Sequence, residues 1–387
     1  MASNMLDDSP ASVPPRETAP ALVVVYRNQP AAQTRGHESA TRLELGRRLA
    51  AIKKLDFGGE FNHGERYPAP LYYVPSETLC RNEMRTDLGI RDEHDLFGGV
   101  VPHAFVATKV ITHGLVTPDA VAPRGWSAPL AAELEPVVLP GYSVFRAADA
   151  RLACMRLLEQ GPVRVKKASG IGGLGQWVVD SMLQFETVLG ELPDEEISVY
   201  GLVLDLNLSA QVATHSVGQV RVGDLLATYC GTQQLARNNL GQEVYGGSRL
   251  TVVRGDFDVL GKLDLSPEVR TIISKAGKYH AGAMAAFPGL FASRCNYDVV
   301  TGADSAGHQH CGVLEQSWRA GGASGAEIAA LEAFQHDPAL NVVQASTSEV
   351  YGEHAVVPPD AVIYFDGIDE NVGRLTKFSR LESYAHP

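Results

Sequence analysis

The sequence predicts a mixed α and β protein of two or three packed lobes, the first of them a small α/β domain. The chain has 387 residues, which is more than one compact domain usually contains. A strand pattern, a polar loop and a helix pattern follow one another at 21–54, as they do in an α/β unit. Further strand and helix patterns follow, and the sequence contains no internal repeat.

In the first half of the chain, three segments have a clear pattern. Residues 21–26 are apolar without alternation, which is typical of a buried parallel strand. Residues 39–54 carry apolar side chains at helical spacing, so we expect a helix there. Residues 147–160 predict a second helix, which ends at Gly161.

The segments between them are less regular. Residues 57–102 are interrupted by glycine and proline and receive no assignment. Residues 105–116 fit a helix or a strand, because their β-branched side chains suit both patterns. Residues 118–140 contain five prolines and predict an extended connector.

The second half predicts paired strands and two more helices. Strand patterns cover 197–208, 212–222, 225–235, 294–300 and 312–317, and helix patterns cover 267–287 and 326–335. The strands at 212–222 and 225–235 are expected to form a hairpin around Gly223.

Composition excludes several classes of protein. The net charge of −12 argues against nucleic acid and anionic membranes as partners, because both attract basic surfaces. No apolar run reaches the ~20 residues that a membrane-spanning helix needs. Residues 1–20 lack the features of a signal peptide and predict a disordered tail. Five scattered cysteines without CxxC spacing fit a reducing cytoplasm.

A glycine-rich loop at 162–176 is the strongest local motif. Val163 and Val165 alternate with Arg164 and Lys166, which predicts a strand with one polar face. Glycines at 170, 172, 173 and 175 follow, and such loops let backbone amides approach a phosphate closely. Three interpretations stay open: a nucleotide phosphate site, a dinucleotide site through the G-x-G-x-x-G at 170–175, and a surface loop.

The same residues carry a resemblance to a known family. Lys167-Ala168-Ser169-Gly170, followed by Gly172, Gly173 and Gly175, resembles the lid of ATP-grasp enzymes, particularly of the biotin carboxylase type. In that family the lysine before the glycines binds ATP phosphate. The resemblance places this role on Lys167, with Lys166 second because the strand register is uncertain by one residue.

Two predicted strands near the end of the chain carry acids. Alternation places Asp298 on one face of 296–300, and it places Glu315, Ser317 and Arg319 together on one face of 313–319. If the two faces coincide, Asp298 and Glu315 converge, and two carboxylates beside a triphosphate suit Mg²⁺. The alternative is a hairpin whose acids are simply solvated.

The order of these motifs extends the resemblance to about 100–330. ATP-grasp enzymes end their nucleotide site with an acidic strand and then E-x-N-x-R, which here is Glu315-x-Ser317-x-Arg319, with Ser317 in place of the usual Asn. The resemblance implies that Asp298, Glu315 and Ser317 bind Mg²⁺ and that Arg319 steadies the transferring group. It further implies an early phosphate-binding lysine, Lys109.

The family also implies an adenine-binding hinge strand, which here would contain Leu204 and Asp205. Two polar segments have no assigned role: the loop with Arg237, Asn238, Tyr245 and Arg249, and the histidines His308 and His310, for which a solvated loop is favoured over a metal site.

The resemblance implies an ATP-grasp fold of two α+β lobes that clasp ATP, with a small α/β domain before them. The expected divisions are a tail at 1–20, the small domain at 21–100, the lid lobe at 101–200 and the metal lobe at 201–387. The chain is also similar to a group of bacterial ATP-grasp-like proteins of unassigned function.

The implied activity is a cytoplasmic, ATP- and Mg²⁺-dependent ligase. It would join a small-molecule carboxylate to an amine or thiol through an acyl phosphate, and a homodimer is compatible with it. The competing interpretations are a nucleotide-binding module without turnover and a dinucleotide-dependent oxidoreductase.

Overall fold

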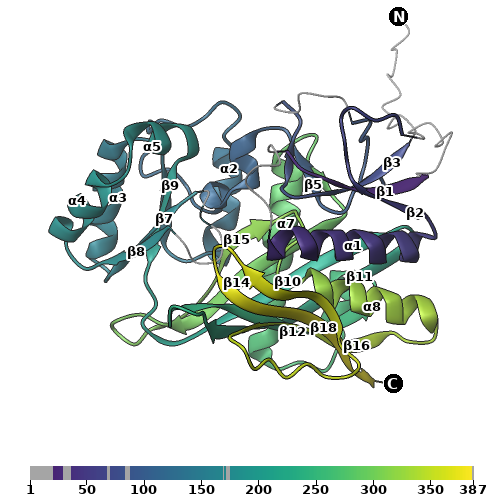
Figure 1. The fold of residues 1–387 in the computed structure, drawn as a ribbon. Coiled ribbons are helices and arrows are strands. Elements are labelled where there is room, and N and C mark those ends of the chain that lie inside the picture. The colour runs from purple at the N-terminus through teal and green to yellow at the C-terminus, as the bar shows by residue number, and fades with distance from the viewer. Residues whose placement is uncertain are drawn as a thin grey trace, which may run out of the picture.

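The computed structural model describes residues 21–28, 36–67, 70–82, 88–168, 170 and 175–385. The tail expected at 1–20 lies outside the described residues. Figure 1 shows a small α/β domain, a small lobe around β7 and β9, and a large sheet flanked by helices. This arrangement confirms the predicted fold class, two α+β lobes preceded by a small α/β domain. Among the described residues, no helix is long and apolar enough to cross a membrane.

The first domain is built on a short parallel sheet. Its strands β1 (Leu22–Tyr26), β2 (Asp56–Glu60) and β3 (Leu71–Pro75) lie in the order β2-β1-β3. The central β1 is almost entirely buried, as its unbroken apolar run predicts. Helix α1 (His37–Lys53) connects β1 to β2 and packs against the same sheet.

A second short sheet joins this domain to the later chain. It contains β4 (Leu79–Cys80), β5 (Gly99–Val101) and β13 (Phe291–Ala292), in the order β13-β5-β4. Two 3-10 helices follow, η2 (Ala104–Ala107) and η3 (Lys109–Thr112), so the segment left open at 105–116 is neither an α-helix nor a strand.

The small lobe is a four-stranded antiparallel sheet with helices on one face. Its elements are β6 (Gly141–Val144), α3 (Ala147–Leu158), β7 (Val163–Lys167), β8 (Gln176–Val179), α4 (Met182–Gly190), α5 (Asp194–Tyr200) and β9 (Leu202–Leu206). The strand order is β6-β9-β7-β8. Val163, Val165 and Leu204 share one hydrophobic cluster with residues of α3 and α4. The opposite face of the sheet therefore carries Arg164, Lys166 and Asp205.

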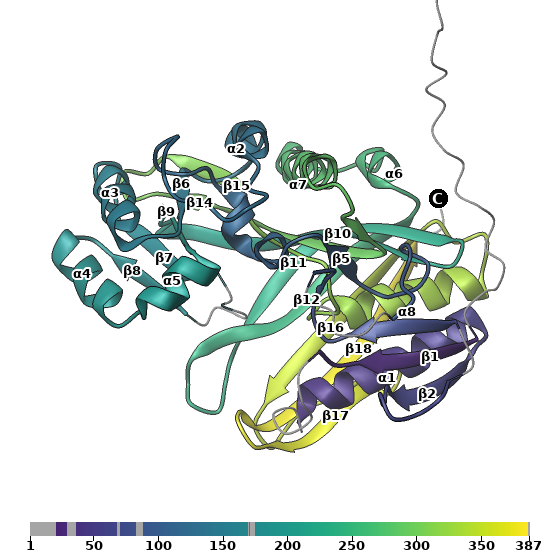
Figure 2. The same ribbon diagram turned by 90° about the horizontal axis from the view of Figure 1, so that it is seen from above.

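The large sheet has eight strands in the order β15-β14-β10-β11-β12-β16-β18-β17. The strands are β10 (Ala210–Val222), β11 (Leu225–Arg237), β12 (Glu243–Arg254), β14 (Arg294–Ala303), β15 (Gln309–Ser317), β16 (Val342–Tyr351), β17 (Val362–Asp369) and β18 (Gly373–Ala385). Figure 2 shows α2 (Ala128–Leu134), α6 (Phe257–Gly261) and α7 (Pro267–Ala286) on one face. On the other face lie α8 (Ser324–His336) and the first domain.

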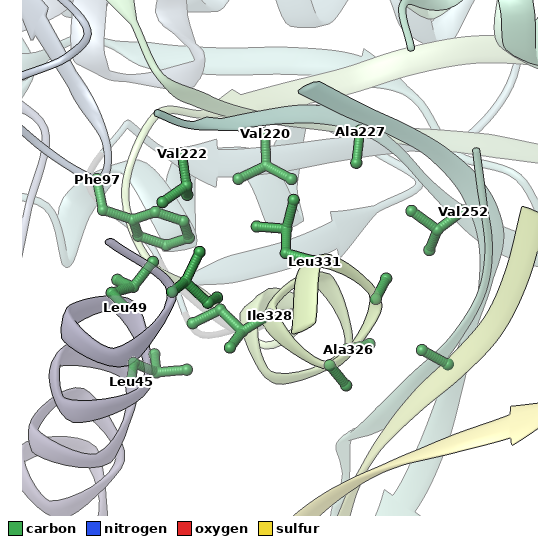
Figure 3. Packing of buried hydrophobic residues seen from close by; sticks show 14 of the residues in the cluster. Leu45, Leu49, Phe97, Val220, Val222, Ala227, Val252, Ala326, Ile328 and Leu331 are labelled. Atoms are coloured by element: carbon green, nitrogen blue, oxygen red, sulfur yellow. The ribbon is translucent and has the colours of Figure 1, made fainter. Parts of the chain in front are cut away.

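The main core lies between α1, α8 and the large sheet. In Figure 3, Leu45 and Leu49 of α1 approach Ile328 of α8, and Val220 of the sheet lies above them. Polar contacts also join the two helices. Arg48 forms an ion pair with Glu332, and Gln335 Nε2 donates to the carbonyl oxygen of Ile52 at 2.7 Å.

The turn between the last two strands reaches back to the start of α1. Asp369 Oδ2 accepts a hydrogen bond from the backbone N–H of His37 at 2.8 Å. The preceding Gly36 has φ of 150°, and an added Cβ would lie 2.2 Å from that carboxylate oxygen, so the close approach requires glycine. The tip of the β11–β12 hairpin meets the same turn, where Asn239 donates to the carbonyl oxygens of Val372 and Arg374.

Two predicted segments differ from the structure. The connector expected at 118–140 contains α2, because Ser127 caps the helix and Pro129 occupies a first-turn position, where proline is tolerated. The strand expected at 197–208 begins only at Leu202. The residues before it form α5, which starts after Pro193 with acidic residues in its first turn.

A candidate nucleotide and metal site

The two acids expected to converge lie directly opposite each other. Strands β14 and β15 pair antiparallel, with Asp298 across from Glu315 and Asn296 across from Ser317. A bulge follows this pair, between Asp298 and Val299, and it shifts the register of the rest of the hairpin. The two carboxylates therefore lie on the same face of the hairpin, immediately before the shift in strand register.

The environment of Asp298 disfavours its ionised form. Burial and the nearby negative charge of Glu315 raise the pKa of Asp298 to about 7. Its Oδ1 accepts hydrogen bonds from the side-chain amides of Gln233 and Asn296, each at 2.8 Å. Two adjacent carboxylates offer the hard oxygen ligands that Mg²⁺ prefers.

Lys109 joins the acidic pair to the start of the glycine-rich loop. Its side chain is only 4% exposed, and its Nζ lies 2.7 Å from Glu315 Oε2. The same ammonium group donates to the carbonyl oxygen of Gly170 at 2.7 Å. Three segments that are distant in sequence, η3, β15 and the loop after β7, thus meet at one lysine.

The neighbouring backbone explains why Lys109 is held at this point. Gln316 Nε2 donates to the carbonyl oxygens of Val106 at 3.0 Å and of Thr108 at 2.8 Å. Because Gln316 follows Glu315 on β15, its side chain fixes the turn before η3 against the strand that carries the acid. Thr108 Oγ1 accepts from the N–H of Val110 and caps the short helix.

Lys166 and Lys167 point to opposite faces of the small sheet. Lys166 is buried and its Nζ contacts Asp205 Oδ2 at 2.5 Å on the face away from the helices. Lys167 reaches Glu196 of α5, with an Nζ to Oε2 distance of 2.9 Å. Lys166 is therefore the lysine of β7 that shares a face with the expected hinge acid Asp205.

Asp205 is the centre of a buried charged group. Burial opposes its ionisation, but the charges of Lys166 and His113 outweigh burial and lower its pKa. His113 Nε2 lies 3.8 Å from Asp205 Oδ2, and both side chains are at most 2% exposed. Leu204, the other expected hinge residue, packs instead in the cluster with α3 and α4.

The glycine-rich loop is only partly described. Ser169, Gly172 and Gly173 lie outside the described residues. Gly175 has φ of 70°, and an added Cβ would lie 3.2 Å from Lys167 Cδ, so a side chain would be strained there. The loop connects two antiparallel strands, β7 and β8. A dinucleotide fingerprint instead leads from a strand into a helix, so the G-x-G-x-x-G lacks its required context.

Ser317 and Arg319 lie next to a buried ion pair that sequence analysis missed. Arg294 and Glu327 are at most 1% exposed and meet at 2.7 Å. Arg294 also donates to the carbonyl oxygen of Arg319 at 2.6 Å and to Ser317 Oγ at 3.4 Å. A signal was present in the sequence, because Arg294 lies two and four residues before Asn296 and Asp298, on the same strand face.

The remaining candidates divide between the site and the surface. Tyr245 lies against the loop before α8, since a Cβ at Gly322 would meet its ring at 2.5 Å. Arg237 and Asn238 belong to the exposed hairpin tip. His308 and His310 both contact the carboxylate of Asp304. Among the described residues, no group of three or more His, Cys, Asp or Glu side chains is placed to hold a metal.

Comparison with known families gives one match along most of the chain. The model of the family described as "Protein of unknown function (DUF3182)" matches residues 24–379. The chain belongs to this family. No curated protein matches the sequence of this DUF3182 chain.

Solved structures with a similar outline have low sequence identity. N5-carboxyaminoimidazole synthetase from Staphylococcus aureus, complexed with ADP, is 12% identical with a TM-score of 0.49, covering 94% of each chain. Phosphoribosylamine–glycine ligase from Thermotoga maritima is 14% identical with a TM-score of 0.47, covering 94% of this chain and 90% of that one. D-alanyl-alanine synthetase A from Vibrio cholerae is 11% identical with a TM-score of 0.46, covering 78% and 89%. The strand order of this chain is itself the evidence for its fold.

Proposed function

We propose that the DUF3182 protein is an ATP- and Mg²⁺-dependent ligase that activates a carboxylate as an acyl phosphate and passes it to an amine or thiol. The observation that carries this proposal is the position of Lys109. One buried ammonium group contacts the start of the glycine-rich loop and the acid of β15. A triphosphate bound between these two segments would meet a cation, the glycine-rich loop and a carboxylate pair together.

Residues of both lobes would hold the nucleotide. Lys109 and Lys166 contact Glu315 and Asp205, and each ammonium group would exchange its carboxylate partner for phosphate. Lys167 contributes through the loop that it precedes. The backbone of the β9 strand around Leu204 and Asp205 is the proposed hinge for adenine.

The acidic pair would hold the metal. Asp298 and Glu315, with Ser317 on the same strand face, offer oxygen ligands to Mg²⁺, which would neutralise charge on the β and γ phosphates when bound. Asp298 must lose its proton to serve as a ligand, because its pKa is raised to about 7.

The acceptor carboxylate would lie beyond the γ-phosphate, beside Arg319. A guanidinium at this position stabilises the negative charge of the transferring group and of the acyl phosphate. The glycine-rich loop at 170–175, covering the phosphates, would keep water from the acyl phosphate, which otherwise hydrolyses.

A nucleotide-binding module without turnover is the second candidate. Ser317 favours it, because a shorter side chain replaces the usual Asn and its Oγ already accepts a contact from Arg294. Such a protein would bind ATP and Mg²⁺ but would release no ADP with any acceptor.

Two assays test the proposal. A thermal-shift experiment with ATP–Mg²⁺ should raise the melting temperature, and NAD should not, because only a ligand of the native state stabilises it. ADP release, measured over a panel of carboxylates with amines and thiols, should appear for the wild type and be absent in Glu315→Gln. The matched control is Glu186→Gln, which removes an exposed carboxylate of α4. Full activity in Glu315→Gln would refute the metal assignment.

A further inference from the structure

A buried chain of hydrogen bonds leads from α8 to the acid of β14. The Tyr229 hydroxyl donates to Glu327 Oε1 at 2.6 Å and to Asn296 Oδ1 at 3.0 Å. Asn296 Nδ2 in turn donates to Asp298 Oδ1 at 2.8 Å. Tyr229 and Glu327 are both 0% exposed, so water does not compete for these contacts. Asp298 is therefore connected, through an amide and a phenol, to a buried carboxylate on a helix.

A glycine on the strand between them makes the Tyr229 contact possible. Strand β10 lies between β11 and β14, and Gly218 pairs with Tyr229 on one side and with Asn296 on the other. A Cβ at Gly218 would lie 2.4 Å from the hydroxyl oxygen of Tyr229. The absence of a side chain at this position leaves the space through which the hydroxyl reaches across β10 to Asn296.

A second amide from β11 reaches the same carboxylate. Gln233 lies four residues after Tyr229 on the same strand face, and its Nε2 donates to Asp298 Oδ1 at 2.8 Å and to Ser216 Oγ at 3.0 Å. The amides of Gln233 and Asn296 thus contact one oxygen. Within the described part of the chain, Asp298 Oδ2 accepts no hydrogen bond, although each carboxylate oxygen can accept two. The two amides fix the carboxylate and leave Oδ2 for a ligand.

The end of the neighbouring acidic strand is tied to the same helix residue. Glu327 meets Arg294 at 2.7 Å, and Arg294 donates to Ser317 Oγ at 3.4 Å and to the carbonyl oxygen of Arg319 at 2.6 Å. One buried carboxylate of α8 therefore holds both β14 and the end of β15. Networks in which each member fixes the next make the side chains at their ends rigid.

We propose that Tyr229 is a positioning residue of the Mg²⁺ site. It holds Asn296, and Asn296 and Gln233 together hold Asp298 so that Oδ2 is available to the metal. This inference rests on the proposed function and extends it to residues that would not touch the ion. Removing a group that orients a metal ligand typically weakens metal binding by about 10–100-fold, because the ligand must then become ordered when the ion binds.

The test measures the Mg²⁺ requirement separately from nucleotide binding. The full-length protein is saturated with a non-hydrolysable ATP analogue, and its melting temperature is followed while Mg²⁺ is titrated. A parallel sample contains the analogue and EDTA. The variants are Tyr229→Phe and Gln233→Met, which remove one hydroxyl and one amide with little change in side-chain volume. Circular dichroism confirms that each variant is folded.

Each variant has a matched control elsewhere in the sheet. Tyr364→Phe removes a buried hydroxyl that contacts α1 and β18 rather than β14. Gln219→Met removes an amide that donates to Thr228 at 3.0 Å rather than to Asp298. These substitutions match the test variants in chemistry and leave the contacts of Asp298 in place.

The expected result is a change in the Mg²⁺ midpoint alone. Tyr229→Phe and Gln233→Met should each need about tenfold more Mg²⁺ than the wild type for half of the metal-dependent shift, while the shift in EDTA stays the same. A merely structural role would lower the starting melting temperature and leave the Mg²⁺ midpoint unchanged, which is the result expected for the controls. If Tyr229→Phe does not fold, Gln233→Met decides.

The inference is overturned if a folded Tyr229→Phe or Gln233→Met has the same Mg²⁺ midpoint as its control while the wild type responds to Mg²⁺. A wild type that responds to the analogue but not to Mg²⁺ would refute the metal assignment together with this inference. A wild type that does not respond to the analogue at all would refute the proposed function, and the inference would fall with it.

Discussion

Replacing Asp298 by Asn should stabilise the ligand-free protein while removing its response to Mg²⁺–ATP. Burial and Glu315 raise the pKa of Asp298 from 3.8 to about 7. A carboxyl group whose pKa is raised on folding stabilises the native state at low pH, and that contribution is lost as the pH rises through 7. Asn keeps the acceptor oxygen that Gln233 and Asn296 use, but it carries no charge.

The size of the effect follows from the two pKa values. At pH 8 ionisation of Asp298 lowers the free energy of unfolding by at most about 4 kcal/mol relative to a neutral side chain. This value is the difference between the two pKa values multiplied by about 1.4 kcal/mol for each pKa unit. At pH 5, where the folded state keeps its proton and the unfolded state does not, the difference falls to about 2 kcal/mol. The advantage of the variant should therefore shrink by about half between pH 8 and pH 5.

Urea denaturation followed by circular dichroism measures this difference at both pH values. Asp304→Asn is the control with the opposite sign, because hydrogen bonds from His310 and His308 lower the pKa of Asp304 and its ionised form stabilises the fold. If Asp298→Asn destabilises the protein at pH 8, or changes its stability equally at both pH values, the carboxylate repulsion described here is wrong. Retention of the Mg²⁺-dependent part of the ATP thermal shift would refute the metal role.

Three further predictions concern buried charges. Lys109→Met should weaken binding of a non-hydrolysable ATP analogue by about tenfold or more in calorimetry, and unchanged affinity would remove the central contact of the proposal. Lys166→Met should lower the free energy of unfolding by about 3–5 kcal/mol, because Asp205 is left as a buried unpaired charge, whereas Lys167→Met at its more exposed pair should cost about 1 kcal/mol or less. Equal losses in urea would contradict the two-face assignment. Glu327→Gln should also cost about 3–5 kcal/mol by the same measurement, and a loss under about 1 kcal/mol would mean that Arg294 finds another partner.

The acidic pair was predictable because strand alternation decides it. The period of two places Asp298 and Glu315 on definite faces of their strands. The register that sets the two residues opposite each other comes from the structure, because the predicted strands are separated by the long polar loop at 301–311. The bulge after Asp298 was not predictable, since no glycine or proline marks it in the sequence.

The two lysines of β7 show how a residue pattern and a resemblance can favour different positions. Alternation with Val163 and Val165 places Lys166 on the polar face, and the structure confirms this, whereas the motif favoured Lys167. Which lysine binds phosphate stays a prediction. The alternation of side chains predicted the orientation of Lys166 better than the motif did, because orientation depends only on the pleat of one strand.

Other features depend on contacts that the sequence does not show. The strand predicted at 197–208 includes residues 197–200 because Ile197 and Val199 are apolar, yet Pro193 and the three acids after it begin a helix that covers these residues. The packing of α1 against α8 depends on the pair of Arg48 and Glu332, which are 284 residues apart. No local pattern reports such a contact.

The hydrogen bond from the backbone N–H of His37 to Asp369 fastens the first turn of α1 to the turn before β18. A truncation at residue 368 would remove this carboxylate, and it would also remove β18, which pairs with β16 in the large sheet. The shortened chain would lose an anchor of its first helix and would expose the edge of β16, so damage to the last hairpin would affect the first domain as well as the sheet.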